Sequence, residues 1–513
     1  MPSSDFPSRI AKAYASHGKV VELGRAMKGG DTFAEAPVQV PASMCNRHGL
    51  IAGATGTGKT KTLQLMAEQL SAMGVPVFVS DIKGDLTGLT RPGEPSDRIQ
   101  QRVDDMGIEW APAGFPVTFL SLGGIGPGVP VRATISSFGP QLLAKVIDAN
   151  ETQASSLTLV FRYADDNGLA LLDLDDLREV LKFLTSDEGK AELKDIGGLS
   201  AATAGVLLRK IIELEEHGGD SFFGEPELDV ADLLRRTPEG AGVISCLELA
   251  AVQGKPRLFS TFLMWLLAEL FHELPEVGDL DQPKLVFFFD EAHLLFDGAS
   301  KAFLDSVTQT VRLIRSKGVG VFFVTQLPDD VPGLVLAQLG NRVQHALRAF
   351  TPRDAKALKA AVTTYPKTDD YDLEEDLTQL GTGEAMVTIL SERGAPTPVV
   401  WTKLRPPQSL MAAIEPEAVD RSARDSSLWP TYAQQIDRES AREMLAARMA
   451  ESAAAAAAEQ GRKDAPPPPP PKQPKGGGKR DDNVVVGYLK SREGRSMINT
   501  VARGVFGLMR KRR

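Results

Sequence analysis

The sequence is poor in the residues that build disulfide-linked or metal-centred proteins. Its 513 residues include two cysteines, Cys45 and Cys246, which lie far apart and show no CxxC spacing. This argues against both a disulfide framework and a zinc site, and it is typical of the reducing cytoplasm. The six histidines are scattered along the chain, so they suggest no other metal cluster.

Long apolar runs are also missing. No stretch approaches the roughly 20 apolar residues that a membrane-spanning helix needs, and residues 1–19 lack the apolar core of a secretory signal. With 42% hydrophobic and 24% charged residues, the composition is that of an ordinary globular protein. We therefore expect a cytoplasmic protein with two or three domains, or one large domain with insertions.

Positive charge is concentrated at the C-terminal end of the sequence. Residues 462–513 hold 14 Lys or Arg against 4 Asp or Glu, although the whole chain has a net charge of −9. The rest of the chain is therefore strongly acidic. It shows neither a basic stripe nor a pattern of aromatic residues for stacking bases. Net charge alone thus does not indicate a nucleic-acid-binding protein.

Short apolar runs separated by helical stretches begin near residue 45. The runs that read as strands are 48–53, 75–80, 116–122, 242–249, 284–290, 318–325, 342–349, 384–390 and 397–404. Continuous apolar strands are typical of a mostly parallel sheet with helices on both faces, so an α/β fold is predicted. Residues 138–235, between the third and fourth strands, have helical periodicity and are expected to form a helical insertion.

The flanks of this core, which we place at residues 45–405, differ from it. Residues 1–44 form a short N-terminal segment with a helical stretch and a β-like one. Residues 406–460 are a helical extension that ends in alanines. Residues 461–482, rich in proline and glycine, are expected to be a disordered linker, and residues 483–513 a basic amphipathic tail.

One motif indicates nucleotide chemistry. The stretch GATGTGKT, Gly53 to Thr60, matches the P-loop pattern G-x-x-x-x-G-K-[ST] between an apolar strand and a helical stretch. Its glycines let backbone N–H groups converge on phosphates at a helix N-terminus. Lys59 should reach the β- and γ-phosphates of ATP, and Thr60 should ligate Mg²⁺. The predicted nucleotide-binding residues are Gly53, Ala54, Thr55, Gly56, Thr57, Gly58, Lys59, Thr60 and Lys61.

Two adjacent acids follow the most apolar strand. In LVFFFDEAHLLF, residues 285–296, the apolar run ends at Asp290 and Glu291. Asp290 is predicted to hold Mg²⁺ directly or through water, and Glu291 to activate a water for attack on the γ-phosphate. The alternative for Glu291 is a solvated cap at the start of a helix. The pair predicts an ATP hydrolase.

Polar residues near other strand ends add candidates. Gln326, after the strand 318–325, is a candidate sensor of the γ-phosphate or an ordinary polar strand end. Asp81, after the strand 75–80, is a candidate partner of Mg²⁺ or its water, whereas Asp85 and Gly88 equally suit a turn.

Four arginines are candidates for stabilising charge on the γ-phosphate across a subunit boundary. Arg312 and Arg315 fall in the last turns of a predicted helix, where cations are favourable in any case. For Arg315, a role as an arginine finger and a role as a stabilising cation at the helix C-terminus are about equally favoured. For Arg312, the role at the helix C-terminus is preferred. Arg342 and Arg348, on the next strand, are further candidates of the same kind.

Four segments together resemble the HerA/FtsK superfamily of P-loop ATPases, most closely bacterial proteins with a HerA-like helicase C-terminal domain. They are NRHGLIAGATGTGKTKTL, SDIKGDLTGL, FFFDEAHLLF and IRSKGVGVFFVTQLPDDVP. The resemblance covers residues 45–405, and residues 491–513 are similar to the tail of that bacterial group. It implies a RecA-like core, a hexameric ring, Arg315 as an arginine finger in trans and Gln326 as the sensor.

Two functions remain open. One is an ATP-driven ring motor, a helicase or translocase on DNA, as in HerA-type relatives. The other is an ATP-gated interaction protein whose basic tail docks to a membrane surface or a protein partner. DNA phosphate suits the charges of the tail as well as anionic lipid does, and a solvated tail without a partner is a third reading.

Overall fold

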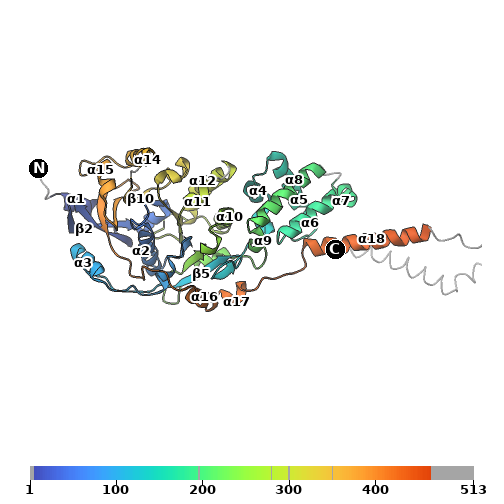
Figure 1. Cartoon of the computed structure of the whole chain (residues 1–513), viewed down its shortest axis with the longest axis horizontal. Helices are drawn as coiled ribbons and strands as arrows, with labels where there is room; N and C mark the ends of the chain where they lie inside the picture. Colours follow the sequence, from blue (N-terminus) through green and yellow to red (C-terminus); the bar gives the residue numbers. More distant parts are fainter. Residues whose placement is uncertain (1–4, 194–196, 279, 298–300, 349–350, 464–513) are drawn as a thin grey trace, which may run out of the picture. The chain divides into compact units, whose positions relative to one another are not determined.

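A large sheet organises the part of the chain that the structure describes (Figure 1). Its strands are β1 (Val20–Lys28), β2 (Asp31–Pro41), β3 (Gly49–Ala52), β4 (Val77–Asp81), β5 (Val117–Leu122), β6 (Val129–Val131), β7 (Ile244–Glu248), β8 (Leu285–Phe289), β9 (Val319–Thr325), β10 (Asn341–Gln344), β11 (Glu384–Thr388) and β12 (Val400–Leu404). They follow the order β2-β1-β12-β11-β10-β3-β9-β8-β4-β7-β5-β6.

The computed structural model describes residues 5–193, 197–278, 280–297, 301–348 and 351–463. The predicted linker beyond residue 463 and the predicted tail, residues 483–513, lie outside this part. By its contacts the chain divides into two units, residues 1–449 and 450–513. The first unit contains the whole sheet and the P-loop.

The sheet is parallel over its longer part and antiparallel at one end. The strands from β10 to β6 in that order all run parallel. The strands β2, β1, β12 and β11 pair antiparallel, and β11 joins them to β10. The segment before the P-loop therefore adds β1 and β2 to the sheet. From the sequence, only one short β-like stretch was expected there.

The helices are α1 (Phe6–Ala13), α2 (Lys59–Ala72), α3 (Asp97–Met106), α4 (Ile135–Val146), α5 (Glu151–Asp166), α6 (Leu174–Thr185), α7 (Asp187–Glu192), α8 (Ala201–Glu216), α9 (Gly219–Phe222), α10 (Pro256–Glu273), α11 (His293–Phe296), α12 (Lys301–Ile314), α13 (Gly333–Leu336), α14 (Pro352–Thr363), α15 (Leu373–Gln379), α16 (Pro416–Arg424), α17 (Trp429–Tyr432) and α18 (Ala441–Lys463). Helices α5 to α9 lie within residues 138–235, for which a helical insertion was expected, whereas α4 begins three residues earlier, at Ile135. Helices α16 to α18 follow the last strand.

Helices cover both faces of the sheet. Successive side chains of a strand point to opposite faces, so Phe287 and Phe289 join one buried cluster with α10 and α12, whereas Phe288 joins another with α2. The ring of Phe288 stacks on that of Phe322 in β9, with centroids 5.1 Å apart. The continuous apolar run of β8 is thus explained by burial on both sides, as predicted for a parallel sheet.

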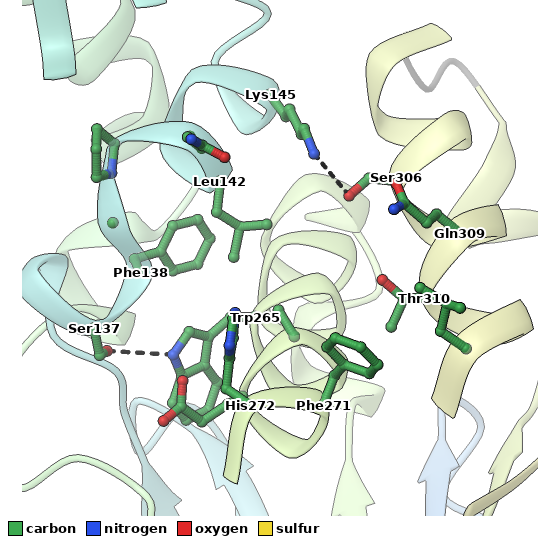
Figure 2. A pocket seen from close by; sticks show the side chains of 16 residues that line it. Ser137, Phe138, Leu142, Lys145, Trp265, Phe271, His272, Ser306, Gln309 and Thr310 are labelled. Atoms are coloured by element: carbon green, nitrogen blue, oxygen red, sulfur yellow. Dashed lines mark hydrogen bonds between the residues drawn. The ribbon is translucent and has the colours of Figure 1, made fainter. Parts of the chain in front are cut away.

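A cavity of about 420 Å³ lies where the helical insertion meets the helices of the sheet. Figure 2 shows Phe138 of α4, Trp265 of α10 and Ser306 of α12 around it. The Trp265 indole donates to the Ser137 hydroxyl over 3.3 Å, and Lys145 Nζ donates to Ser306 Oγ over 3.0 Å. These bonds join α4 to the layer of helices that packs on the sheet.

The predicted strand 342–349 is wrong at its C-terminal end, because β10 ends at Gln344. His345 N–H still donates to Ala52 O over 2.7 Å, and Ala346 O then accepts from Ala54 N–H over 2.8 Å. The chain therefore leaves the sheet to follow the P-loop.

Within the described residues, no helix is both long and apolar enough to cross a lipid bilayer.

Candidate nucleotide-binding and hydrolytic site

The P-loop connects β3, in the interior of the sheet, to the N-terminus of α2. Gly53, Gly56 and Gly58 have φ of +152°, +79° and +116°, which side chains other than glycine rarely adopt. A Cβ on Gly53 would also come within 2.5 Å of the His345 Cβ. The backbone conformation of the loop therefore requires glycine at these three positions of the predicted motif.

Lys59 begins α2 and turns back over the loop. Its Nζ donates to Gly53 O over 2.7 Å and to Ala54 O over 3.2 Å, and the side chain is buried. Burial lowers the pKa of the Lys59 ammonium, while Glu291 and Asp290 oppose that shift. The cation is thus held beside the N–H groups that begin α2, where the charge and the helix dipole both favour an anion.

Asp290 follows β8, which is one strand removed from β3 with β9 between them. Because these strands are parallel, their carboxyl ends share one edge of the sheet. The residue is 1% exposed, and its Oδ2 is buried without a hydrogen-bond partner among the described residues. Burial and then the Glu291 carboxylate raise the pKa of Asp290 to about 7. An unpartnered buried carboxylate oxygen fits Mg²⁺, which takes oxygen ligands.

This pKa leads to a prediction about magnesium. A ligand must be deprotonated to bind metal, so raising the pH from 6 to 8 should tighten Mg²⁺ binding about tenfold and then have little further effect. The check is the Mg²⁺ concentration for half-maximal ATPase activity at each pH. The Asp290→Asn variant should show only the weaker pH dependence that ATP itself contributes. An equal dependence in both proteins would contradict the assignment.

Glu291 is 5% exposed and has φ of +47°, a strained conformation for a glutamate. Its carboxylate accepts from the Lys83 ammonium and lies 3.2 Å from His293 Nδ1. His293 and then Lys83 lower the pKa of Glu291 to about 2 despite its burial. The carboxylate is therefore ionised at neutral pH. The residue that caps α11 is Ala292, not Glu291.

Gln326 directly follows β9, between the P-loop strand and the strand of Asp290. Its carbonyl accepts from Gly53 N–H over 3.2 Å, and its side chain is exposed. Gln326 and His293 both line a cavity of about 690 Å³ that opens at this edge. The position suits a polar contact to the last phosphate of a nucleotide.

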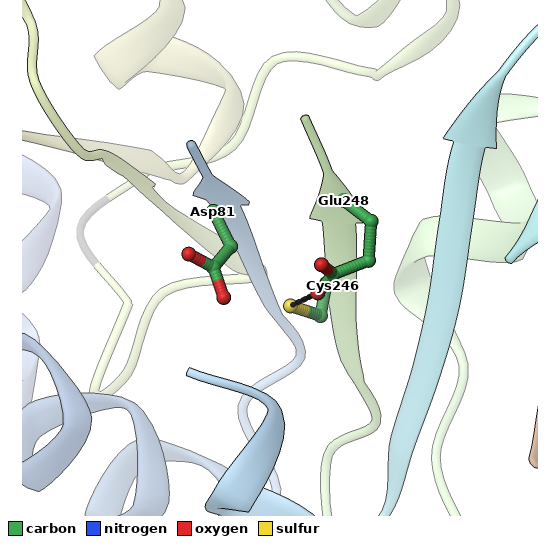
Figure 3. Close-up of side chains that lie close together, drawn as sticks. All are labelled: Asp81, Cys246 and Glu248. Atoms are coloured by element: carbon green, nitrogen blue, oxygen red, sulfur yellow. Dashed lines mark hydrogen bonds between the residues drawn. The ribbon is translucent and has the colours of Figure 1, made fainter. Parts of the chain in front are cut away.

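Asp81 shapes the turn that follows β4. Its Oδ1 accepts from Gly84 N–H over 2.7 Å, and its Oδ2 accepts from Leu86 N–H over 2.8 Å. Figure 3 shows that Cys246 and Glu248 of β7 lie beside it, and the thiol donates to Glu248 Oε1 over 3.4 Å. Burial raises the pKa of Asp81 to about 6 and that of Glu248 to about 8. The observed partners of Asp81 thus support a structural role in the turn.

Comparison with known proteins identifies the family. The family model described as "Helicase HerA-like C-terminal" matches residues 27–512. The chain belongs to this family. This confirms the α/β fold of a P-loop ATPase that the sequence predicted.

Individual relatives match this chain either over a short segment or at low sequence identity. The chain is 34% identical to "Probable helicase MJECL08" of Methanocaldococcus jannaschii over 119 residues, which are 22% of this chain and 21% of that protein. The conjugative coupling protein TrwBΔN70, unbound, superposes with a TM-score of 0.51 at 16% identity over 80% of this chain and 93% of that chain. TrwB in complex with ADP and Mg²⁺ gives 0.50 at 17% identity over 78% and 98%. At these identities the likeness of the structures concerns the fold.

The arginines of this HerA-like chain lie at different edges of the sheet. Arg315 is exposed in the 3₁₀ turn Arg315–Lys317 before β9, at the end opposite Gln326. The strand spans roughly 20 Å, so Arg315 does not reach the P-loop of its own chain. Arg312 is exposed in the last turn of α12.

Arg342 and Arg348 belong to the segment that contains β10. Arg342 donates to the carbonyls of Leu336, Leu339 and Thr364 over 3.2–3.4 Å, so it ties neighbouring segments together. Arg348 is exposed, two residues beyond the carbonyl that binds the P-loop residue Ala54. Of the four arginines, Arg348 is the one placed on the P-loop edge of the sheet.

Two residues of the site, Lys83 and His293, were given no role from the sequence, although both contact Glu291 in the structure. His293 could have been found from the local sequence, because it lies two positions after Glu291 in DEAH. Lys83 is separated from Glu291 by 208 positions. Their contact depends on the pairing of β4 with β8, which no local pattern specifies.

Proposed function

We propose that this HerA-like protein hydrolyses ATP and couples hydrolysis to movement on DNA, as a helicase or translocase in a hexameric ring. The observation that carries the proposal is the pair at the end of β8. The unpartnered Oδ2 of Asp290 and the ionised Glu291 share one sheet edge with the P-loop. Membership of the HerA-like family and a relative named a probable helicase support the motor.

Each residue has a role in this proposal. The P-loop N–H groups and Lys59 bind the phosphates, and Thr60 with Asp290 holds Mg²⁺. Bound Mg²⁺ neutralises charge on the phosphate oxygens. Glu291 orients the attacking water and takes its proton, and Gln326 contacts the γ-phosphate. TrwB, a neighbour in fold, has been solved with ADP and Mg²⁺, which supports these ligands.

Glu291 has two cations beside it that matter for this chemistry. Lys83 and His293 keep the carboxylate ionised and hold it at the end of β8. As a base it must exchange one of these contacts for the water. We therefore assign Lys83 and His293 to the positioning of Glu291, and the strained φ of Glu291 to the same task.

The ring places Arg315 of one subunit at the nucleotide of its neighbour. Its position at the edge opposite its own P-loop supports action across a subunit boundary. Because the chain is acidic over most of its length, we propose that DNA binds to lysines and arginines gathered in the pore of the ring.

Two measurements test the DNA and ring parts. Double-stranded DNA should stimulate ATP hydrolysis several-fold at low salt, and the stimulation should disappear at high salt because phosphate contacts are screened. The assembly should have a mass of about 330 kDa, that of six 55.2 kDa chains. Hydrolysis without stimulation by any nucleic acid would instead favour the ATP-gated interaction protein.

A further inference from the structure

A buried histidine lies at the end of the P-loop strand that is far from the P-loop. His48 directly precedes β3 and is 3% exposed. Its backbone has φ of +57° and ψ of +168°, a region that is essentially confined to glycine. Such a conformation persists only where the surrounding structure holds it, and it is commonest at functional sites. The hydrolytic site does not account for it, because the P-loop lies at the other end of β3.

The imidazole of His48 connects the P-loop strand to β9. Its Nδ1 accepts from Val321 N–H over 3.1 Å, close to the start of β9. Burial lowers the pKa of His48 to about 4. The backbone of Val311 in α12 opposes that shift, whereas the charges of Arg315 and Arg47 add to it. The ring is therefore neutral at pH 7, so Nδ1 can accept, and Arg315 is among its charged neighbours.

The segment that carries His48 packs directly on the start of β9. A Cβ on Gly320 would come within 2.2 Å of Cys45 O, so only glycine lets the two backbones approach this closely. The carbonyl of His48 accepts from Asn341 N–H over 3.2 Å and from Asn341 Nδ2 over 3.0 Å, which attaches the same segment to β10. His48 is thus fixed relative to both strands that flank β3.

Strand β3 is short and is attached to β9 at both ends. It has four residues, Gly49–Ala52, which pair in parallel with β9. At its C-terminal end Gly53 N–H donates to Thr325 O over 3.2 Å, and at its N-terminal end lies the contact of His48. The turn Arg315–Lys317 leads into the same start of β9. The turn that carries Arg315 is therefore attached to the strand that carries the P-loop.

We propose that His48 is a positioning residue: by accepting from Val321 it fixes the turn that carries Arg315, and so holds that arginine for the nucleotide of the neighbouring subunit. The proposal rests on the proposed action of Arg315 across the subunit boundary and adds what fixes it. It also accounts for the backbone of His48. Glycine at this position would relieve the strain but would remove the acceptor.

Two variants separate the imidazole from the backbone. His48→Gly suits the backbone conformation but lacks the acceptor, so it should bind ATP within roughly twofold of the wild type. Its hydrolysis should fall by about 30-fold, less than the loss expected when the arginine itself is removed. His48→Asn keeps an acceptor close to the position of Nδ1, and its rate should stay within about threefold of the wild type. A wild-type rate in His48→Gly, or an equal loss in both variants, would overturn the proposal.

Mixed rings show on which side of the interface His48 acts. Each complete site needs Glu291 from one subunit and a positioned Arg315 from its neighbour. Rings of Glu291→Gln and His48→Gly subunits in equal amounts should therefore regain about a quarter of the wild-type rate. Rings of His48→Gly and Arg315→Ala should regain nothing, because both changes affect the same side of the interface. If His48 served the P-loop of its own subunit, these two results would be reversed, and the proposal would be overturned.

A third mixture, Glu291→Gln with Arg315→Ala, keeps this outcome separate from that of the proposed function. If it regains activity while the His48→Gly mixtures show the reversed pattern, only the role of His48 fails. If it stays inactive, the action of Arg315 across the boundary fails, and the inference fails with it. Should His48→Gly not assemble, His48→Ala, which also lacks the acceptor, enters the same two mixtures and is judged by the same pattern.

Discussion

Replacing Glu291 by glutamine is expected to lower the rate of ATP hydrolysis by about 10²-fold or more. Glutamine preserves the size of the side chain but cannot accept a proton from the attacking water. ATP binding should persist, because the P-loop, Lys59 and Asp290 are unchanged. The measurement is steady-state phosphate release alongside the dissociation constant for ATP.

A second buried glutamate provides a matched control. Glu248 lies at the same sheet edge, but burial raises its pKa to about 8, so it is largely protonated at neutral pH. Glutamine resembles a protonated glutamate in shape and charge, and Glu248→Gln should therefore keep its rate within roughly twofold of the wild type. If Glu291→Gln hydrolysed ATP as fast as this control, Glu291 would not be the base.

The second large effect concerns Arg315. If it completes the site of the neighbouring subunit, Arg315→Ala should lower hydrolysis by about 10³-fold, the usual effect of losing an arginine finger. The control is Arg312→Ala, about one turn earlier and also exposed, which should retain most of the activity.

Mixing two inactive proteins separates action in trans from action in cis. In rings assembled from equal amounts of Glu291→Gln and Arg315→Ala subunits, some interfaces join an intact Glu291 to an intact Arg315. About a quarter of the interfaces should be complete, and activity should return to about that fraction of the wild type. Mixed rings that remain inactive would show that Arg315 does not act across the boundary.

The parts of the fold that local sequence specifies were predictable. The strands β3 and β8 and the P-loop could be read directly, because strands buried on both faces are continuous apolar runs and the loop needs glycine at fixed positions. The strand β6 could not be predicted, because its three residues include Pro130 and are too few to show the hydrophobic pattern of a strand. The early end of β10 depends on the close approach of His345 to Gly53, a contact between distant segments.

The same distinction holds for the site. Asp290 and Glu291 were found because they end a strand, whereas Lys83 reaches Glu291 only through the pairing of β4 with β8. His48 reaches Val321 across 273 positions of the sequence, through the pairing of β3 with β9. Neither contact is specified by a local motif, because both depend on strand order.

The most direct test of the account is the identity of the nucleotide bound after incubation with MgATP. Wild-type protein should carry ADP, and Glu291→Gln should carry intact ATP, because the variant binds but does not cleave. ADP on both proteins would contradict the role of Glu291, and the absence of nucleotide from both would contradict the site as a whole.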